Sequence, residues 1–197
     1  MNILIISAKI VLFCVLIFFS LSQTSWAASL SLSEFAKKTV YNYLTNKNNP
    51  KTLSIKPLEN FHPVIGVFVT IKNDSNVTRG CWGDLYPQGG LRESIEKAAI
   101  HAVKTDYRKG PISISELPML SFQVTLVKKI DPIASYAEIN PFIDGLLVRS
   151  SQKSAIILPG EATDPYYQMI MAKVKAGISE KESYTLFRLV SNVYKER

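Results

Sequence analysis

The stretch 64-VIGVFVTIKNDSNVTRGCWG-83 decides the fold that this sequence predicts. Residues 64–72 are almost continuously apolar and rich in β-branched and aromatic side chains, which is typical of a buried strand. The four residues 73-NDSN-76 favour a turn, and residues 77–83 follow it. We therefore expect an antiparallel β-hairpin in which Cys81 lies near the end of the second strand, where a tight turn leads the chain out of the sheet.

The rest of the chain adds helices and further strands around this hairpin. Helices are predicted over 31–46 and 91–106 and from Pro165 to Gly177, and strands over 120–130, 146–150 and 154–159. Residues 184–194 fit either a helix or a strand by periodicity, and their β-branched and aromatic content favours a strand. This order of elements predicts an α+β domain, with a mainly antiparallel sheet of about five to six strands and flanking helices.

The N-terminal segment, residues 1–27, has the layout of a secretory signal peptide. Lys9 precedes the apolar run 10-IVLFCVLIFF-19, and the small residues of 25-SWA-27 suit a cleavage site. An uncleaved membrane anchor over residues 3–22 is the alternative, because that stretch just reaches the length of a membrane span. The folded domain is thus expected to occupy residues 28–197, in the periplasm or secreted.

The composition argues against several classes of function. The formal net charge is +7, but the basic residues are scattered and form no stripe interleaved with aromatic residues, so nucleic-acid binding is not expected. An anionic ligand, an acidic membrane surface or simple solubility would each fit this charge. We expect no metal and no cofactor, because the sequence lacks His-x-x-His and Cys-x-x-Cys spacing, a P-loop and the glycine pattern Gly-x-Gly-x-x-Gly.

Seven segments in order resemble the AMMECR1 (AMMECR-one) family, and the resemblance extends over nearly all of residues 28–197. They are 66-GVFVTIK-72, 79-RGCWG-83, the helix that begins at Leu91, 106-DYR-108, 116-ELP-118, 144-DGLLV-148 and 158-LP-159. The resemblance implies a two-lobed α+β fold on an antiparallel sheet, without an established activity. It also suggests Memo-like and radical-SAM proteins as functional partners. Trp82, Tyr107 and Lys109 depart from the family pattern, and most members are cytosolic or nuclear.

Cys81 is the centre of the predicted site. Arg79 lies two residues away and would share its face of the strand if the strand geometry persists, and a nearby cation favours the reactive thiolate. Gly80 and Gly83 would allow the backbone to approach a ligand closely. The family resemblance further implies that Asp106 and Arg108 lie beside the cysteine segment. In this interpretation Asp106 orients groups or exchanges protons, while Arg79 and Arg108 hold an anion.

Three functional hypotheses follow from these residues. The first is an envelope module that binds a small anionic ligand or a protein partner through the RGCWG segment, with Trp82 in the ligand site. The second is a thiol-dependent enzyme in which Cys81 is the nucleophile or a redox residue. The third is a structural role, since free cysteines are commonly buried as small apolar groups.

Two aromatic residues have their own expectations. His101 lies off the apolar face of its helix, on the flank with Ser94 and Lys97, and is expected to be exposed. Trp82 is expected to cover the core beneath the sheet or, alternatively, to form an apolar wall for a ligand, with Tyr86 nearby.

Overall fold

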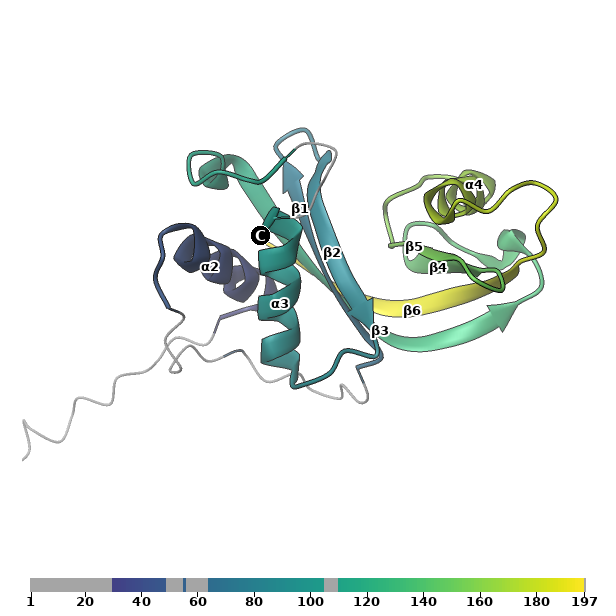
Figure 1. Ribbon diagram of the computed structural model, residues 1–197, viewed down its shortest axis with the longest axis horizontal. Coiled ribbons are helices and arrows are strands. Elements are labelled where there is room, and N and C mark those ends of the chain that lie inside the picture. The colour runs from purple at the N-terminus through teal and green to yellow at the C-terminus, as the bar shows by residue number, and fades with distance from the viewer. Residues whose placement is uncertain (1–29, 49–54, 56–63, 105–109, 197) are drawn as a thin grey trace, which may run out of the picture.

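The computed structural model describes residues 30–48, 55, 64–104 and 110–196. Over these residues it has three α-helices and one six-stranded antiparallel sheet (Figure 1). In chain order the elements are α2 (Leu32–Leu44), β1 (Gly66–Asn73), β2 (Thr78–Leu85), α3 (Leu91–Lys104), a 3-10 turn at Leu117–Met119, β3 (Leu120–Ile133), a second 3-10 turn at Tyr136–Glu138, β4 (Asp144–Arg149), β5 (Ser154–Ile157), α4 (Pro165–Ala176) and β6 (Thr185–Lys195).

The sheet runs through both lobes of the molecule in the order β2-β1-β3-β6-β4-β5, and every neighbouring pair is antiparallel. The long strands β3 and β6, of 14 and 11 residues, continue from the lobe of α2 and α3 into that of α4 (Figure 1). The pairing of these strands shifts register between Val127 and Lys129, where the sheet passes from one lobe to the other. The predicted α+β class and two-lobed antiparallel sheet are therefore confirmed.

Local sequence signals account for where the helices begin and end. The Ser31 side chain accepts a hydrogen bond from the backbone N–H of Glu34, whose own side chain reaches back to the Ser31 backbone, so a capping box begins α2. Asp164 caps α4, Pro165 occupies its first turn, and Gly177 ends it with a positive φ of 68°. These signals explain why the helices predicted from the sequence are present in the structure.

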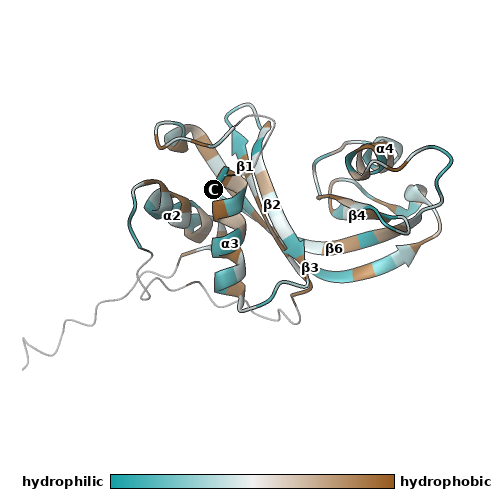
Figure 2. Cartoon of the chain, viewed as in Figure 1, coloured by the Kyte–Doolittle hydropathy of each residue, from teal (hydrophilic) through white to brown (hydrophobic). Residues whose placement is uncertain are grey.

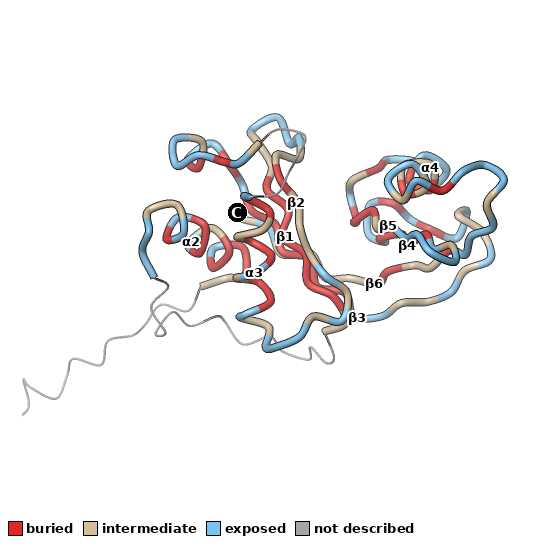
Figure 3. The backbone as a smooth tube through the Cα atoms, in the orientation of Figure 1, coloured by how far each residue is buried: buried red, intermediate tan, exposed pale blue. Residues whose placement is uncertain are grey.

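The core formed by the described residues consists of three groups of buried apolar side chains. One lies between the sheet and helices α2 and α3, and a second lies between the sheet and α4. The third joins the lobes on the opposite face and contains Phe68, Val127, Leu147, Leu158 and Leu189. Tyr194 packs with the first group and Leu186 with the second, eight residues apart on β6, so the helices of both lobes cover the same face of this strand. Apolar stretches (Figure 2) and buried residues (Figure 3) accordingly occur in both lobes.

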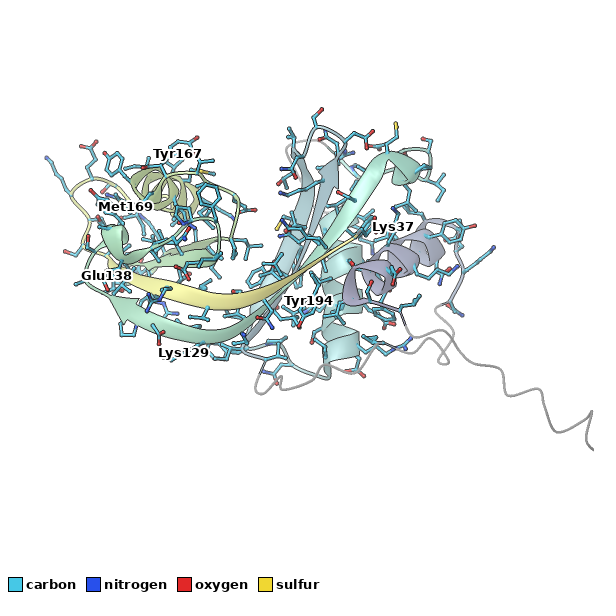
Figure 4. All side chains as sticks on the ribbon, turned by 180° about the vertical axis from the view of Figure 1, so that it is seen from behind. Lys37, Lys129, Glu138, Tyr167, Met169 and Tyr194 are labelled. Atoms are coloured by element: carbon cyan, nitrogen blue, oxygen red, sulfur yellow. The ribbon has the colours of Figure 1, made fainter. Side chains whose placement is uncertain are left out.

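An ion pair joins α2 to the residue that follows β6. The ammonium group of Lys37 lies 3.0 Å from the Glu196 carboxylate and donates to the Leu120 carbonyl at 2.9 Å. Figure 4 shows Lys37 on α2 beside the last part of β6. Over the described part of the chain, none of the helices has the length and apolar character needed to cross a membrane. The predicted signal peptide, residues 1–27, lies outside the described residues.

Two details of the sequence prediction are wrong. The strand predicted over 120–130 continues to Ile133, because β6 pairs with it along its whole second half. The RGCWG segment is not a turn out of the sheet. It is the middle of strand β2, where Cys81 lies opposite Thr70 and pairing with β1 continues as far as Leu85.

Candidate functional site

A groove of about 490 Å³ lies between the two lobes, beside the apolar group that contains Phe68 and Leu147. One wall is the edge strand β2, which contributes the five consecutive residues Cys81–Leu85, and Tyr86 follows directly after it. The other wall is formed by β4, by the edge strand β5 and by the last turn of α4. Both edge strands therefore line one groove. The curl of the sheet that brings them there is visible in Figure 1.

Cys81 is half-buried in the wall formed by β2. Its sulfur lies 3.4 Å from the hydroxyl oxygen of Thr70, the residue opposite on β1, and either atom could be the donor. Cys81 is the free cysteine of the described residues. The predicted site residue thus lines the groove from within strand β2 and not from a tight turn at its end.

The two glycines of the RGCWG segment are explained by packing within the protein. A Cβ atom at Gly80 would lie 2.3 Å from the carbonyl oxygen of Ala102, because α3 crosses β2 at that point. At Gly83 it would lie 2.3 Å from the Phe68 ring, which covers this glycine from the neighbouring strand. The space that we assigned to a close ligand approach is therefore occupied by protein atoms, although Gly83 still lines the groove.

Arg79 is held by the segment that follows α3. Its Nε donates to Glu116 at 2.8 Å, and its two terminal nitrogens donate to the carbonyls of Gly110 and Pro111 at 3.1 and 3.2 Å. Thr78 lies opposite Lys72 and Gly80 opposite Ile71, so Arg79 is the extra residue of a β-bulge. The expectation that Arg79 shares a face with Cys81 is therefore wrong, because the regular alternation of side chains is interrupted at Arg79 itself.

Replacing Arg79 with alanine is expected to lower the free energy of unfolding by about 2 kcal/mol at neutral pH, because two carbonyls and a carboxylate lose their donor. The hydrogen bonds from Arg79 lower the pKa of Glu116 below its ordinary value of 4.5. The ionic part of this stabilisation is therefore present above 4.5 and is lost as the pH falls through the lower pKa of the folded state.

Urea unfolding of the wild type and Arg79→Ala measures this effect at pH 7 and at about pH 3. The difference between the two proteins should become smaller at the acidic pH. Arg79→Lys should restore the charge but only part of the stability, since lysine lacks the planar fork of donors. A difference that is unchanged between the two pH values would contradict the role of Glu116.

Trp82 faces α3 and also borders the groove. Its ring stacks on His101 with the centroids 4.6 Å apart, and the Lys97 ammonium lies 5.2 Å from the centre of the indole. It packs against the core under α3 and lines the groove, and its role as an apolar wall for a ligand stays a prediction. The expectation of an exposed His101 is wrong, because this histidine is half-buried beneath the indole, and Ser94 on the same flank is buried.

Two predicted site residues, Asp106 and Arg108, lie outside the described residues. Their predicted roles as proton-exchanging group and anion clamp stay predictions.

Two cations in the groove were missed by the sequence analysis. Arg149, the last residue of β4, and Lys175, in the last turn of α4, both line the wall opposite Cys81. The Arg149 guanidinium lies 5.4 Å from the centre of the Phe187 ring, and Lys175 donates to the Ile156 carbonyl at 2.8 Å. Asp84 brings a negative charge, but the Lys97 ammonium lies 3.6 Å from its carboxylate. The groove therefore carries an excess of positive charge.

A second groove, also of about 490 Å³, lies at the far end of β3 and the beginning of β6. Its lining includes Tyr136, Tyr184 and Phe187, but no residue of the predicted site and no charged side chain. In the part of the chain that the structure describes, no three His, Cys, Asp or Glu side chains are grouped so as to hold a metal ion. Of the predicted site residues, Cys81, Trp82 and Gly83 line the groove between the lobes, whereas Arg79 and Gly80 do not.

Comparison with known proteins places this fold among relatives without an established activity. The sequence matches the AMMECR1 family model over residues 33–194. Protein Mbar_A1807 of Methanosarcina barkeri is 30% identical over 143 residues, which cover 69% of each chain. A Thermococcus gammatolerans protein is 32% identical over 141 residues, covering 65% of this chain and 66% of that one. The crystal structure of the uncharacterized protein PH0010 from Pyrococcus horikoshii has a TM-score of 0.65 at 23% identity, over 84% of this chain and 90% of that one, which shows a shared fold.

Proposed function

This chain belongs to the AMMECR1 family, and from that premise we propose that it is an envelope binding module whose anionic ligand, a small molecule or part of a partner protein, occupies the groove between β2 and β5. The location in the envelope rests on the apolar run 10–19 and the small residues of 25–27. The binding role rests on the groove itself.

The observation that carries this proposal is that two walls of different chemistry, one with a thiol and an aromatic ring and one with two cations, line the same groove. The β2 wall presents Cys81 and Trp82, and the opposite wall presents Arg149 and Lys175. A volume of about 490 Å³ is within the range of ligand sites in proteins, which combine apolar walls with a few charged groups. Two cations on one wall favour a ligand that carries negative charge.

The dye 8-anilinonaphthalene-1-sulfonate, which joins aromatic rings to one negative charge, is a suitable probe. It is expected to bind the protein and to accept energy from Trp82, the only tryptophan of residues 28–197. Replacing Lys175 or Arg149 with glutamine should weaken this binding by about fivefold each, the effect of losing about 1 kcal/mol of attraction. Fluorescence titration at low ionic strength measures the affinity.

Lys173→Gln is the matched control, because Lys173 is on the same helix but lies over the Tyr184 ring and outside the groove. It should leave the affinity unchanged. Bound dye should also slow the alkylation of Cys81 by iodoacetamide, with Cys81→Ser as the reference that reports any labelling of Cys14 alone. If Lys173→Gln weakens binding as much as Lys175→Gln, or if the dye leaves alkylation unaffected, the groove is not the binding site.

The thiol-dependent enzyme stays the alternative prediction. The same alkylation assay bears on it, because a nucleophilic or redox-active Cys81 must react readily with iodoacetamide in the folded protein at neutral pH. A thiol that reacts only after unfolding would contradict the enzyme and leave the binding proposal to the dye titration.

A further inference from the structure

The edge of β2 that faces the groove has backbone groups suited to receive another strand. Asn73 and Tyr86 donate their backbone N–H groups to Val77 and Ile65, at the two ends of the β1–β2 hairpin. In an antiparallel pair the residues bonded to the partner alternate with residues whose N–H and C=O point away from it. The bulge at Arg79 interrupts this alternation on β2, so it is counted along β1, where the Asn73 N–H and the Ile65 carbonyl both bond on the β2 side. Phe68 and Gly66 then point towards β3, and the residues opposite them, Gly83 and Leu85, direct their N–H and C=O groups away from β1 and towards the groove.

The other edge of the sheet, strand β5, has a side chain bonded to its outer backbone groups, and among the residues that the structure describes β2 does not. The Ser150 N–H bonds to the Lys153 carbonyl at the turn between β4 and β5. Counted from this bond, the same alternation makes Ile156 of β5 point its N–H and C=O groups away from β4. Lys175 donates to that Ile156 carbonyl at 2.8 Å. Proteins commonly use lysine to protect an edge strand from further pairing. Within the described residues, Gly83 and Leu85 have no such partner on the outer side of β2.

The shape and charge of the groove fit an extended chain. The groove follows β2 along five residues and then Tyr86, which corresponds to about 17 Å of strand. Arg149 and Lys175 line the wall opposite that edge. A strand beside β2 would therefore pass between an open backbone edge and two cations.

We propose that the ligand of this groove is an extended acidic segment of a partner protein, which adds a seventh strand to the sheet by pairing with the outer edge of β2. This inference rests on the proposed function, because it names the occupant of the same groove. The outward N–H and C=O groups of Gly83 and Leu85 pair with the backbone of the segment. Arg149 and Lys175 select its acidic side chains. Main-chain pairing supplies affinity and the side chains supply specificity, as in other cases of strand addition.

The probe is the blocked heptapeptide Thr-Val-Glu-Val-Glu-Val-Thr, with Thr-Val-Lys-Val-Lys-Val-Thr as the control for charge. Two N-methylated forms of the acidic peptide, one modified at its valines and one at its glutamates, remove N–H groups on opposite edges of the same strand. The form that loses the N–H groups facing β2 should bind at least about tenfold more weakly, and the other should change little. Isothermal titration calorimetry on the chain without residues 1–27 measures the affinities.

Hydrogen exchange locates the pairing on the protein. The bound peptide should slow amide exchange at Gly83 and Leu85 by about tenfold or more. The amides of Trp82 and Asp84 serve as internal controls, because the same alternation directs them to β1. Leu85→Pro removes one outward N–H and should weaken the binding of the peptide. Leu85→Ala keeps that N–H and should leave the binding unchanged. The peptide modifications leave the protein unchanged, so the test does not depend on whether Leu85→Pro folds.

Three outcomes would overturn this inference. The first is equal binding of both N-methylated peptides, and the second is equal binding of the acidic and basic peptides. The third is a concentration-dependent dimer in sedimentation experiments that protects Gly83 and Leu85 without peptide, which would make a second copy the occupant. In each case, dye binding that still depends on Lys175 would leave the proposed function standing. If dye binding does not depend on Lys175 either, both the proposed function and this inference are contradicted.

Discussion

Gly80→Ala is expected to lower the free energy of unfolding by about 3 kcal/mol, the upper part of the range for overpacking a tight interior. The added Cβ would lie 2.3 Å from the carbonyl oxygen of Ala102, which is backbone and cannot rotate away. Helix α3 must therefore move off β2, or the bulged strand must shift. Both movements would disturb the stack of Trp82 on His101, which lies beside this crossing.

Urea unfolding followed by circular dichroism measures this loss, and the emission of Trp82 in the folded protein reports whether the indole environment changes. Gly90→Ala is the matched control, because a Cβ at Gly90 meets no atom within 4 Å. It should cost less than about 1 kcal/mol, the scale of a change at a helix N-cap. Equal destabilisation by both substitutions would show that the contact with α3 is not the reason for glycine at position 80.

Phe68→Ala is expected to cost about 4 kcal/mol, as is typical of emptying the site of a buried phenylalanine. The ring is 7% exposed and lies in the apolar group that joins the lobes, beside Leu147 and Leu158. It also covers Gly83 from the opposite strand. Its removal leaves a cavity at the floor of the groove and weakens the contact between the two halves of the sheet.

The control for Phe68 is the same substitution at Phe142, which is 64% exposed. Phe142→Ala should change the stability by no more than about 0.5 kcal/mol. Thermal unfolding of both proteins, followed by calorimetry, would show in addition whether Phe68→Ala unfolds in two transitions, one for each lobe, where the wild type unfolds in one. A loss below about 1 kcal/mol at Phe68 would mean that this apolar group does not hold the lobes together.

The elements predicted from the sequence are close to those of the structure, because each has a strong local signal. The hairpin of β1 and β2 follows from an apolar run and four turn residues, and α4 follows from Asp164, Pro165 and Gly177. The tail over 184–194 is the strand that its composition favours. The helix or strand type of each element is thus encoded within a few neighbouring residues.

The site was predicted less completely, because it is assembled from distant parts of the chain. Cys81 and Trp82 do line the groove, but Arg149 and Lys175 come from β4 and α4, which follow β2 much later in the sequence. Neither cation belongs to a motif, and each resembles an ordinary surface residue in the sequence. Arg79 shows the reverse error, since a bulge that the sequence does not reveal directs it to Glu116.

The sequence by itself determined the class of the fold, the order of its elements and a hairpin that carries Cys81, the lone cysteine of residues 28–197. These follow from local hydrophobic periodicity and turn chemistry, which act over a few residues. Only the tertiary structure decided that Gly80 and Gly83 accommodate Ala102 and Phe68, and that the two sheet edges meet across a positively charged groove. Those features depend on how a long sheet curls and packs, and contacts between distant segments leave no local pattern in the chain.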